Sequence, residues 1–153
     1  MPKIDIAELP ADRRTNYPAP FDRVVAGRER KRLGNAAGLD QFGVNLTTLA
    51  PGAASALRHW HRNEDEFIYM LEGEVVLIED GGETVLAPGD AAGFKANHPN
   101  GHHLVNRTDR AAVYLEVGTR SKHERVEYPD VDLLVIRDEK GAHSTHKNGD
   151  PYD

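Results

Sequence analysis

From residue 40 onward, short apolar runs alternate with turn residues in the pattern of an all-β sandwich or barrel. Turn signals such as Asp80-Gly81 and Asn100-Gly101 separate the runs, and both dipeptides tolerate the positive φ of a hairpin. No window of ten residues shows a capped helical stripe. The pattern predicts eight strands, over Phe42–Leu49, Leu57–His61, Glu66–Leu71, Val75–Glu79, Thr84–Ala87, Asp90–Phe94, His102–Asn106 and Ala111–Val117.

The segments on either side of these strands differ from them in composition. Residues 1–23 are rich in proline and lack periodicity, so we expect an extended arm over the domain or a neighbouring subunit, without a catalytic role. Strand-like pieces at Val126–Tyr128 and Leu133–Arg137 precede a polar tail that we expect to be loosely ordered. We therefore divide the chain into an arm and lead-in (1–38), a barrel (39–120), and C-terminal strands with a tail (121–153).

Composition and charge limit the function classes. The 153 residues suffice for one core, and no apolar stretch approaches the roughly 18 residues that span a bilayer. The start also lacks the apolar run of a signal peptide, so we expect a cytoplasmic protein with no membrane partner. With no cysteine, a metal must be held by His, Asp or Glu. The net charge of −6 argues against nucleic acid, and we interpret the basic cluster Arg28–Arg32 as a solvated lead-in to the first strand.

The chemistry of the chain concentrates in histidines. His59 and His61 alternate on one predicted strand, so both imidazoles project from the same face. Glu66 begins the next strand, and a hairpin would bring its carboxylate beside the pair. Later, His102 and His103 are adjacent on one strand, so only one of them can face the interior. Three imidazoles and a carboxylate suit Fe(II), Mn(II), Ni(II), Zn(II) or Cu(II) and leave coordination positions open.

These residues resemble the two motifs of the cupin superfamily over roughly Asp40–Val117. The first motif is met by Gly52 with His59-x-His61-x4-Glu66-x6-Gly73, and the second by Gly89 with His102-x3-Asn106. Lys95 and Asn97 stand where that second motif has proline and glycine, and Asn97–Gly101 holds about two extra residues. The resemblance implies a double-stranded β-helix (jelly-roll) barrel with one divalent transition metal. It also implies the ligands His59, His61, Glu66 and His102, which selects His102 over His103.

The resemblance leaves several functions open. We expect a metal-dependent enzyme acting on a small polar or anionic molecule, by isomerase chemistry that includes sugar or sugar-phosphate substrates, or by lyase or dioxygenase chemistry. Glu66 is either a metal ligand or the catalytic general base. The alternatives are a non-catalytic cupin that binds or senses a small ligand, and a site that keeps its residues without using a metal in catalysis. The remaining histidines are interpreted as structural: His98, His123, His143 and His146.

Strand parity predicts the surroundings of the site. Ile68 and Met70 should face the interior with Glu66, and Tyr69 should face outward. Trp60 should also face outward and indicates a homodimer, because an exposed tryptophan on a sheet is costly. Asn106 shares the face of His102 and is expected to hydrogen-bond a ligand imidazole. Phe94 and Lys95 are candidates for substrate contact at the barrel mouth, whereas Arg58 alternates away from the metal face.

Overall fold

The computed structural model describes residues 2–152, which form an all-β fold with little helix. Helical structure is confined to three short pieces, the 3-10 turns η1 (Ile6–Glu8) and η2 (Phe21–Val25) and the four-residue α1 (Leu33–Ala36). The strands are β1 (Arg28–Arg32), β2 (Phe42–Leu49), β3 (Trp60–His61), β4 (Glu66–Glu72), β5 (Val75–Glu79), β6 (Gly82–Leu86), β7 (Ala91–Phe94), β8 (His103–Val105), β9 (Ala112–Thr119), β10 (Glu124–Glu127), β11 (Leu134–Asp138) and β12 (Gly141–Thr145). The predicted all-β class is confirmed.

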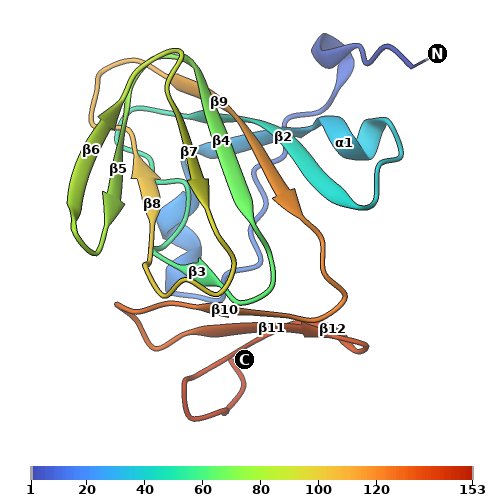
Figure 1. Cartoon of the computed structure of the whole chain (residues 1–153), viewed down its shortest axis with the longest axis vertical. Coiled ribbons are helices and arrows are strands. Elements are labelled where there is room, and N and C mark those ends of the chain that lie inside the picture. The colour runs from blue at the N-terminus through green and yellow to red at the C-terminus, as the bar shows by residue number, and fades with distance from the viewer. Residues whose placement is uncertain (1, 153) are drawn as a thin grey trace.

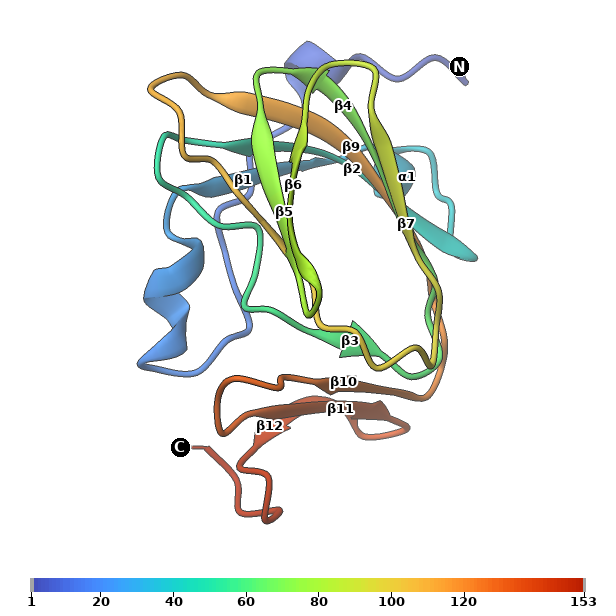
Figure 2. The ribbon, with the colours of Figure 1, turned by 60° about the vertical axis from the view of Figure 1, so that its left-hand side comes forward.

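The strands form three antiparallel sheets (Figure 1). A five-stranded sheet has the order β1-β2-β9-β4-β7, and a three-stranded sheet has the order β6-β5-β8. These two sheets face each other across the barrel in Figure 2. The third sheet, β12-β11-β10-β3, lies across one end, where β10 pairs with β3. The C-terminal strands therefore come directly beside the strand that carries His61.

The main core lies between the two facing sheets. It consists of apolar side chains from both, and its members are Leu49, Ala53, Ile68, Met70, Val75, Leu77, Leu86, Leu104, Ala112 and Tyr114. The parity predicted for β4 is confirmed, because Ile68 and Met70 are buried while Tyr69 is exposed. Burial of each large apolar side chain stabilises the fold by about 1.5–3 kcal/mol.

Residues of the N-terminal arm and of the C-terminal tail meet at a second apolar cluster. Val126, Tyr128 and Leu133 form its buried part, and Tyr17 from the arm and Tyr152 from the tail pack against it. The expectation of a loosely ordered tail is wrong for β12, which pairs with β11 along its whole length. The sequence did not indicate this strand, because Gly141–Thr145 lacks the alternation of apolar and polar residues that marks a strand with one buried face. Most of the strand is exposed.

The basic cluster at residues 28–32 is a strand, not a solvated lead-in. It forms β1 at the edge of the five-stranded sheet and pairs with β2, Arg28 opposite Leu49 and Arg32 opposite Asn45. Arg28 is only 6% exposed. Composition alone could not show this, because an arginine-rich stretch is usually solvated. The arm joins the same edge through the paired backbones of Asp12 and Arg30.

None of the helices between residues 2 and 152 has the length and apolar character needed to cross a membrane.

Candidate metal centre

The four candidate ligands come from three neighbouring places in the fold. His59 lies just before β3 and His61 ends it, Glu66 begins β4, and His102 immediately precedes β8. The backbones of His59 and His102 form an isolated antiparallel bridge, with N–O distances of 3.1 and 2.9 Å. This bridge holds the two imidazoles side by side, with ring centroids 4.7 Å apart. Residues far apart in sequence are thereby brought to one point inside the barrel.

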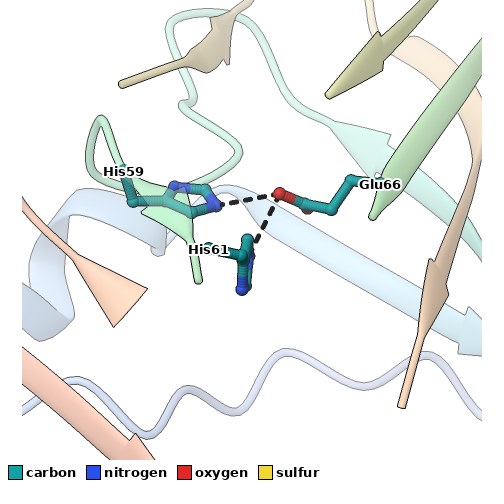
Figure 3. A group of neighbouring side chains, drawn as sticks. All are labelled: His59, His61 and Glu66. Atoms are coloured by element: carbon teal, nitrogen blue, oxygen red, sulfur yellow. Dashed lines mark ion pairs between the residues drawn. The ribbon is translucent and has the colours of Figure 1, made fainter. Parts of the chain in front are cut away.

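Three imidazole nitrogens surround one carboxylate oxygen. Glu66 Oε1 lies 3.4 Å from Nε2 of His59, 3.0 Å from Nε2 of His61 and 3.0 Å from Nε2 of His102. Figure 3 shows the carboxylate reaching from β4 toward His59 and His61, which approach it from the opposite strand. The predicted set is therefore gathered in space, and its members are all buried or half-buried.

The tautomer of His59 is fixed by the backbone. Its Nδ1 lies 2.7 Å from the carbonyl oxygen of Leu57, which can only accept a hydrogen bond, so Nδ1 carries the proton. In the neutral ring, Nε2 then presents a lone pair toward the Glu66 carboxylate. Two lone pairs repel unless a proton or a cation lies between them. The geometry of His59 is that of a metal-ligating imidazole whose other nitrogen is held by a carbonyl.

Two carboxylates that the sequence analysis missed face the other side of His61. Glu124 Oε2 lies 3.4 Å and Glu64 Oε1 3.8 Å from His61 Nδ1, and both glutamates are buried. Among residues 2–152, neither His61 Nδ1 nor Glu124 Oε2 has an aligned hydrogen-bond partner. Burial lowers the pKa of His61, but the carboxylates of Glu124 and Glu66 outweigh it and raise the pKa to about 10. The carboxylates therefore favour the positively charged form of the His61 imidazole.

His102 faces the site and His103 does not. The His102 ring stacks on Phe94 at a centroid distance of 3.6 Å with the planes 3° apart, which fixes its orientation. His103 points away and its Nδ1 lies 2.8 Å from the carbonyl oxygen of Ala56. Burial lowers the pKa of His102, which favours the neutral imidazole that a metal requires. Phe94 thus supports a ligand ring, and because it also lines the adjoining cavity, its contact with a substrate stays a prediction.

His59, His61 and Glu66 form a donor set that fits a divalent transition metal, and His102 approaches this set through its 3.0 Å contact with Glu66. Ligands held by bonds of about 2.1 Å at octahedral or tetrahedral angles lie roughly 3.0–3.4 Å from each other, and the three Nε2–Oε1 separations fall in that range. Burial raises the pKa of Glu66, but hydrogen bonding to the three imidazoles outweighs it and holds the pKa well below its usual value. Glu66 is therefore an ionised ligand or acceptor, and His59, His61 and Glu66 could hold a metal ion together.

A cavity of about 370 Å³ adjoins these side chains. Arg28, Arg30 and Tyr17 line it together with the candidate ligands and Tyr128. The volume is within the range of pockets for small molecules. The arm, for which no catalytic role was expected, supplies Thr15, Asn16 and Tyr17 to the lining. The cavity therefore combines a possible metal site with fixed positive charge.

Two predicted neighbours of the site have other roles. Asn106 does not touch an imidazole: its Nδ2 donates to the carbonyl oxygens of Leu49 and Arg110, at 2.9 and 2.7 Å, and it is completely buried. Trp60 is half-buried, and the Arg62 guanidinium lies 5.7 Å from its ring centroid. Trp60 is therefore partly covered by its own chain, which weakens the reason for expecting a homodimer from it.

The departures from the second cupin motif are accommodated locally. Asn97 adopts φ of 59°, the left-handed conformation that glycine adopts readily and that asparagine tolerates better than most residues. Lys95 pairs with Asp65 at 3.0 Å and is directed to the surface. Arg58 pairs with Asp130 and Asp80 outside the cavity, as its parity predicted.

Comparisons with known proteins agree with this picture. The family model described as "Cupin domain" matches residues 45–118. A crystal structure described as a sugar phosphate isomerase from a cupin superfamily, from Silicibacter pomeroyi, is 46% identical, with 99% of this chain and 97% of that one covered and a TM-score of 0.95. A putative sugar phosphate isomerase from Acidithiobacillus ferrooxidans is 30% identical, with 80% of each chain covered and a TM-score of 0.75.

A more distant structure extends the likeness at the level of the fold. A polyketide cyclase from Streptomyces resistomycificus is 19% identical, with 91% of this chain and 85% of that one covered and a TM-score of 0.65. No curated protein matches the chain significantly.

Proposed function

Because this chain belongs to the cupin superfamily, we propose that it is a divalent-metal-dependent isomerase that acts on a small phosphorylated sugar. The observation that carries the proposal is the convergence of three imidazole Nε2 atoms on one Glu66 oxygen, inside a cavity that also contains arginine. Two similar solved structures, described as a sugar phosphate isomerase and a putative one, support this reaction class.

We assign metal binding to His59, His61 and His102, with Glu66 as the carboxylate of the set. A bound divalent cation would polarise the carbonyl and adjacent hydroxyl of a sugar. An aldose–ketose isomerisation moves one proton between adjacent carbons and one between their oxygens, so it balances without an oxidant or a second substrate. The cavity lining supplies side chains that can transfer protons or form hydrogen bonds, among them Glu66, Tyr17 and Tyr128.

The chain's own residues determine how protons move. Glu66 is held ionised and can accept a proton from a carbon beside the carbonyl. Burial raises the pKa of Tyr17 and, well above its usual value, that of Tyr128, so both phenols stay protonated at neutral pH and can donate a hydrogen bond. The Tyr128 ring lies 5.9 Å from that of His59, next to the candidate metal ligands. The two tyrosines are therefore suited to hydrogen-bond substrate oxygens.

The reaction is tested by proton exchange in D₂O. Purified protein is loaded with Fe(II), Mn(II), Ni(II), Zn(II) or Cu(II) in turn and incubated with a panel of aldose and ketose phosphates. Proton NMR then detects interconversion and deuterium entering at the carbon beside the carbonyl. We expect both for at least one sugar phosphate, and we expect EDTA to abolish them. Metal binding without exchange or interconversion across the panel would contradict the proposed reaction and favour a cupin that binds or senses a ligand.

The variant Glu66→Gln separates the two roles left open for this residue. Glutamine keeps the size of the side chain but cannot act as a base at neutral pH. If Glu66 is mainly the base, the variant keeps its metal and loses turnover. If it is mainly a ligand, metal affinity falls as well. His103→Ala is the matched control, because this neighbouring histidine points away from the site and its loss should leave the metal and turnover in place.

A further inference from the structure

Arg28 is a buried cation that has no acidic partner in the part of the chain that the structure describes. Its side chain comes from β1, and the residue is 6% exposed. The guanidinium donates from Nη1 to the carbonyl oxygen of Ser55 at 2.6 Å and from Nη2 to that of Arg14 at 3.5 Å. Within residues 2–152, no carboxylate lies at ion-pair distance from it. Two carbonyl dipoles do not neutralise a buried charge, whose burial is costly unless it is paired.

The other arginines of the cavity are paired. Arg30 lies 2.7 Å from Glu116, and Arg137 pairs with Glu64. Among the arginines that line the cavity, Arg28 is therefore the one that pairs with no carboxylate of the described residues. Burial lowers the pKa of Arg28 and the nearby charge of Arg30 lowers it further, while the carboxylate of Glu116, which is paired with Arg30, raises it. An anion bound in the cavity would supply a counter-charge for Arg28.

The position of Arg28 relative to the candidate metal suits a substrate that reaches both. Arg28 and the candidate ligands line one cavity of about 370 Å³. The Tyr128 ring, which lines the same cavity, lies 5.9 Å from the His59 ring and 5.7 Å from the Tyr17 ring. Tyr17 is fixed in place because its hydroxyl accepts a hydrogen bond from the backbone N–H of Leu57 at 3.2 Å. A small sugar phosphate has its phosphate and carbonyl at opposite ends, as this arrangement requires.

The arm of the chain completes the surroundings of Arg28. Thr15, Asn16 and Tyr17 line the cavity, and the Arg14 carbonyl is one of the two acceptors that hold the guanidinium. Asp12 anchors the segment by pairing with the backbone of Arg30 at 2.8 and 2.9 Å. The arm is thereby held against the barrel at the place where the unmatched charge lies.

We propose that Arg28, enclosed by the N-terminal arm, is the binding site for the phosphate group of the substrate. This deepens the proposed function and rests on it for the identity of the substrate, but the anion site itself does not require a metal. Arginine is suited to this role because its planar fork donates two parallel hydrogen bonds to one phosphate. Three of its five N–H groups have no acceptor among the hydrogen bonds formed by the described residues.

The test measures binding of inorganic phosphate to metal-stripped full-length protein by isothermal titration calorimetry. We expect one site in the native protein and a Kd at least about tenfold weaker in Arg28→Met, since a hydrogen-bonded charge contact is worth that much or more. Arg28→Lys keeps the charge without the fork and should bind severalfold more weakly than the native protein. Arg107→Met is the matched control, because it removes a surface arginine paired with Glu83 at 2.7 Å, away from the cavity.

Several outcomes would overturn the proposal. The first is that the native protein does not bind phosphate, and the second is that Arg28→Met binds it with native-like affinity. The third is that His61→Ala loses phosphate binding, which would place the anion on the imidazoles. If Arg28→Met does not fold, Arg28→Lys decides, and native-like affinity in it rejects the site. Acetate in place of phosphate distinguishes a carboxylate site, which is expected to bind more weakly. The two proposals can fail separately. If phosphate binding depends on Arg28 but the protein takes up no metal, the anion site is supported and the metal-dependent isomerase is rejected.

Discussion

Glu124→Gln isolates the contribution of a carboxylate that lies behind His61, outside the group formed by His59, His61 and Glu66. Glu124 is 4% exposed, and its Oε2 lies 3.4 Å from His61 Nδ1. Its Oε1 accepts hydrogen bonds from the backbone N–H of Asn63 and Arg125, so the carboxylate is held in place. Glutamine retains the shape and removes the charge that favours a proton on Nδ1. His61 Nε2 then becomes a poorer donor to the metal.

The expected size follows from linkage. Loss of a carboxylate behind a ligating histidine typically weakens metal binding about 10- to 100-fold. At free metal of about 100 times the native Kd, binding stabilises the native protein by about 2.7 kcal/mol, and the variant by only about 0.4–1.4 kcal/mol. For a chain of this size, 1 kcal/mol moves Tm by roughly 2–4 °C. The metal-induced rise in Tm should therefore fall from about 5–11 °C to about 1–6 °C.

The assay is a thermal melt of each variant with and without the metal that binds, at one metal concentration. Glu127→Gln is the matched control, because Glu127 lies on the same strand, faces the opposite side and pairs with Arg125 at 2.8 Å. It should show the native metal-induced rise. A Glu124→Gln protein that is folded and keeps the full native rise would refute the role assigned to this carboxylate.

Three further predictions concern the scaffold. Gly73→Ala should lower the free energy of unfolding by at least about 2 kcal/mol in urea melts, because Gly73 has φ of 70° and a Cβ would lie 2.6 Å from the Ala111 carbonyl oxygen. Gly81→Ala, with open space around it, should differ little, and equal losses would contradict the reasoning. Asn106→Leu should cost about 3 kcal/mol by leaving buried backbone groups unpaired, and a native-like urea midpoint would reject this. The homodimer first expected from Trp60 stays a prediction, and sedimentation velocity should give roughly twice the 16.9 kDa of one chain, whereas a single-chain mass would contradict it.

Local alternation was sufficient to predict the centre of the site. A strand has period two, so His59 and His61 had to share a face, and Ile68 and Met70 had to follow Glu66 inward. Both follow from neighbouring residues alone. The choice between His102 and His103 required more than parity, since either could face inward, and it came from the spacing of His102 to Asn106 in the cupin motif.

Long-range partners could not be predicted in the same way. Glu124 lies about 60 residues from His61 in sequence, and only the pairing of β10 with β3 brings them together. Arg28 appeared to be part of a solvated basic run because the arm and the Ser55 carbonyl that surround it are not local to it. Asn106 was predicted to end a strand, but it lies just after β8, and it was given the wrong partner because parity says nothing about competing backbone acceptors.

The most direct test of the metal-dependent account is the metal content of the protein as purified. After removal of any tag and without added metal, elemental analysis should find close to one equivalent of a single transition metal in the native protein and in His103→Ala. His61→Ala should contain less than about one-tenth of that amount. A native protein without metal, or a folded His61→Ala variant that retains a full equivalent, would contradict the account.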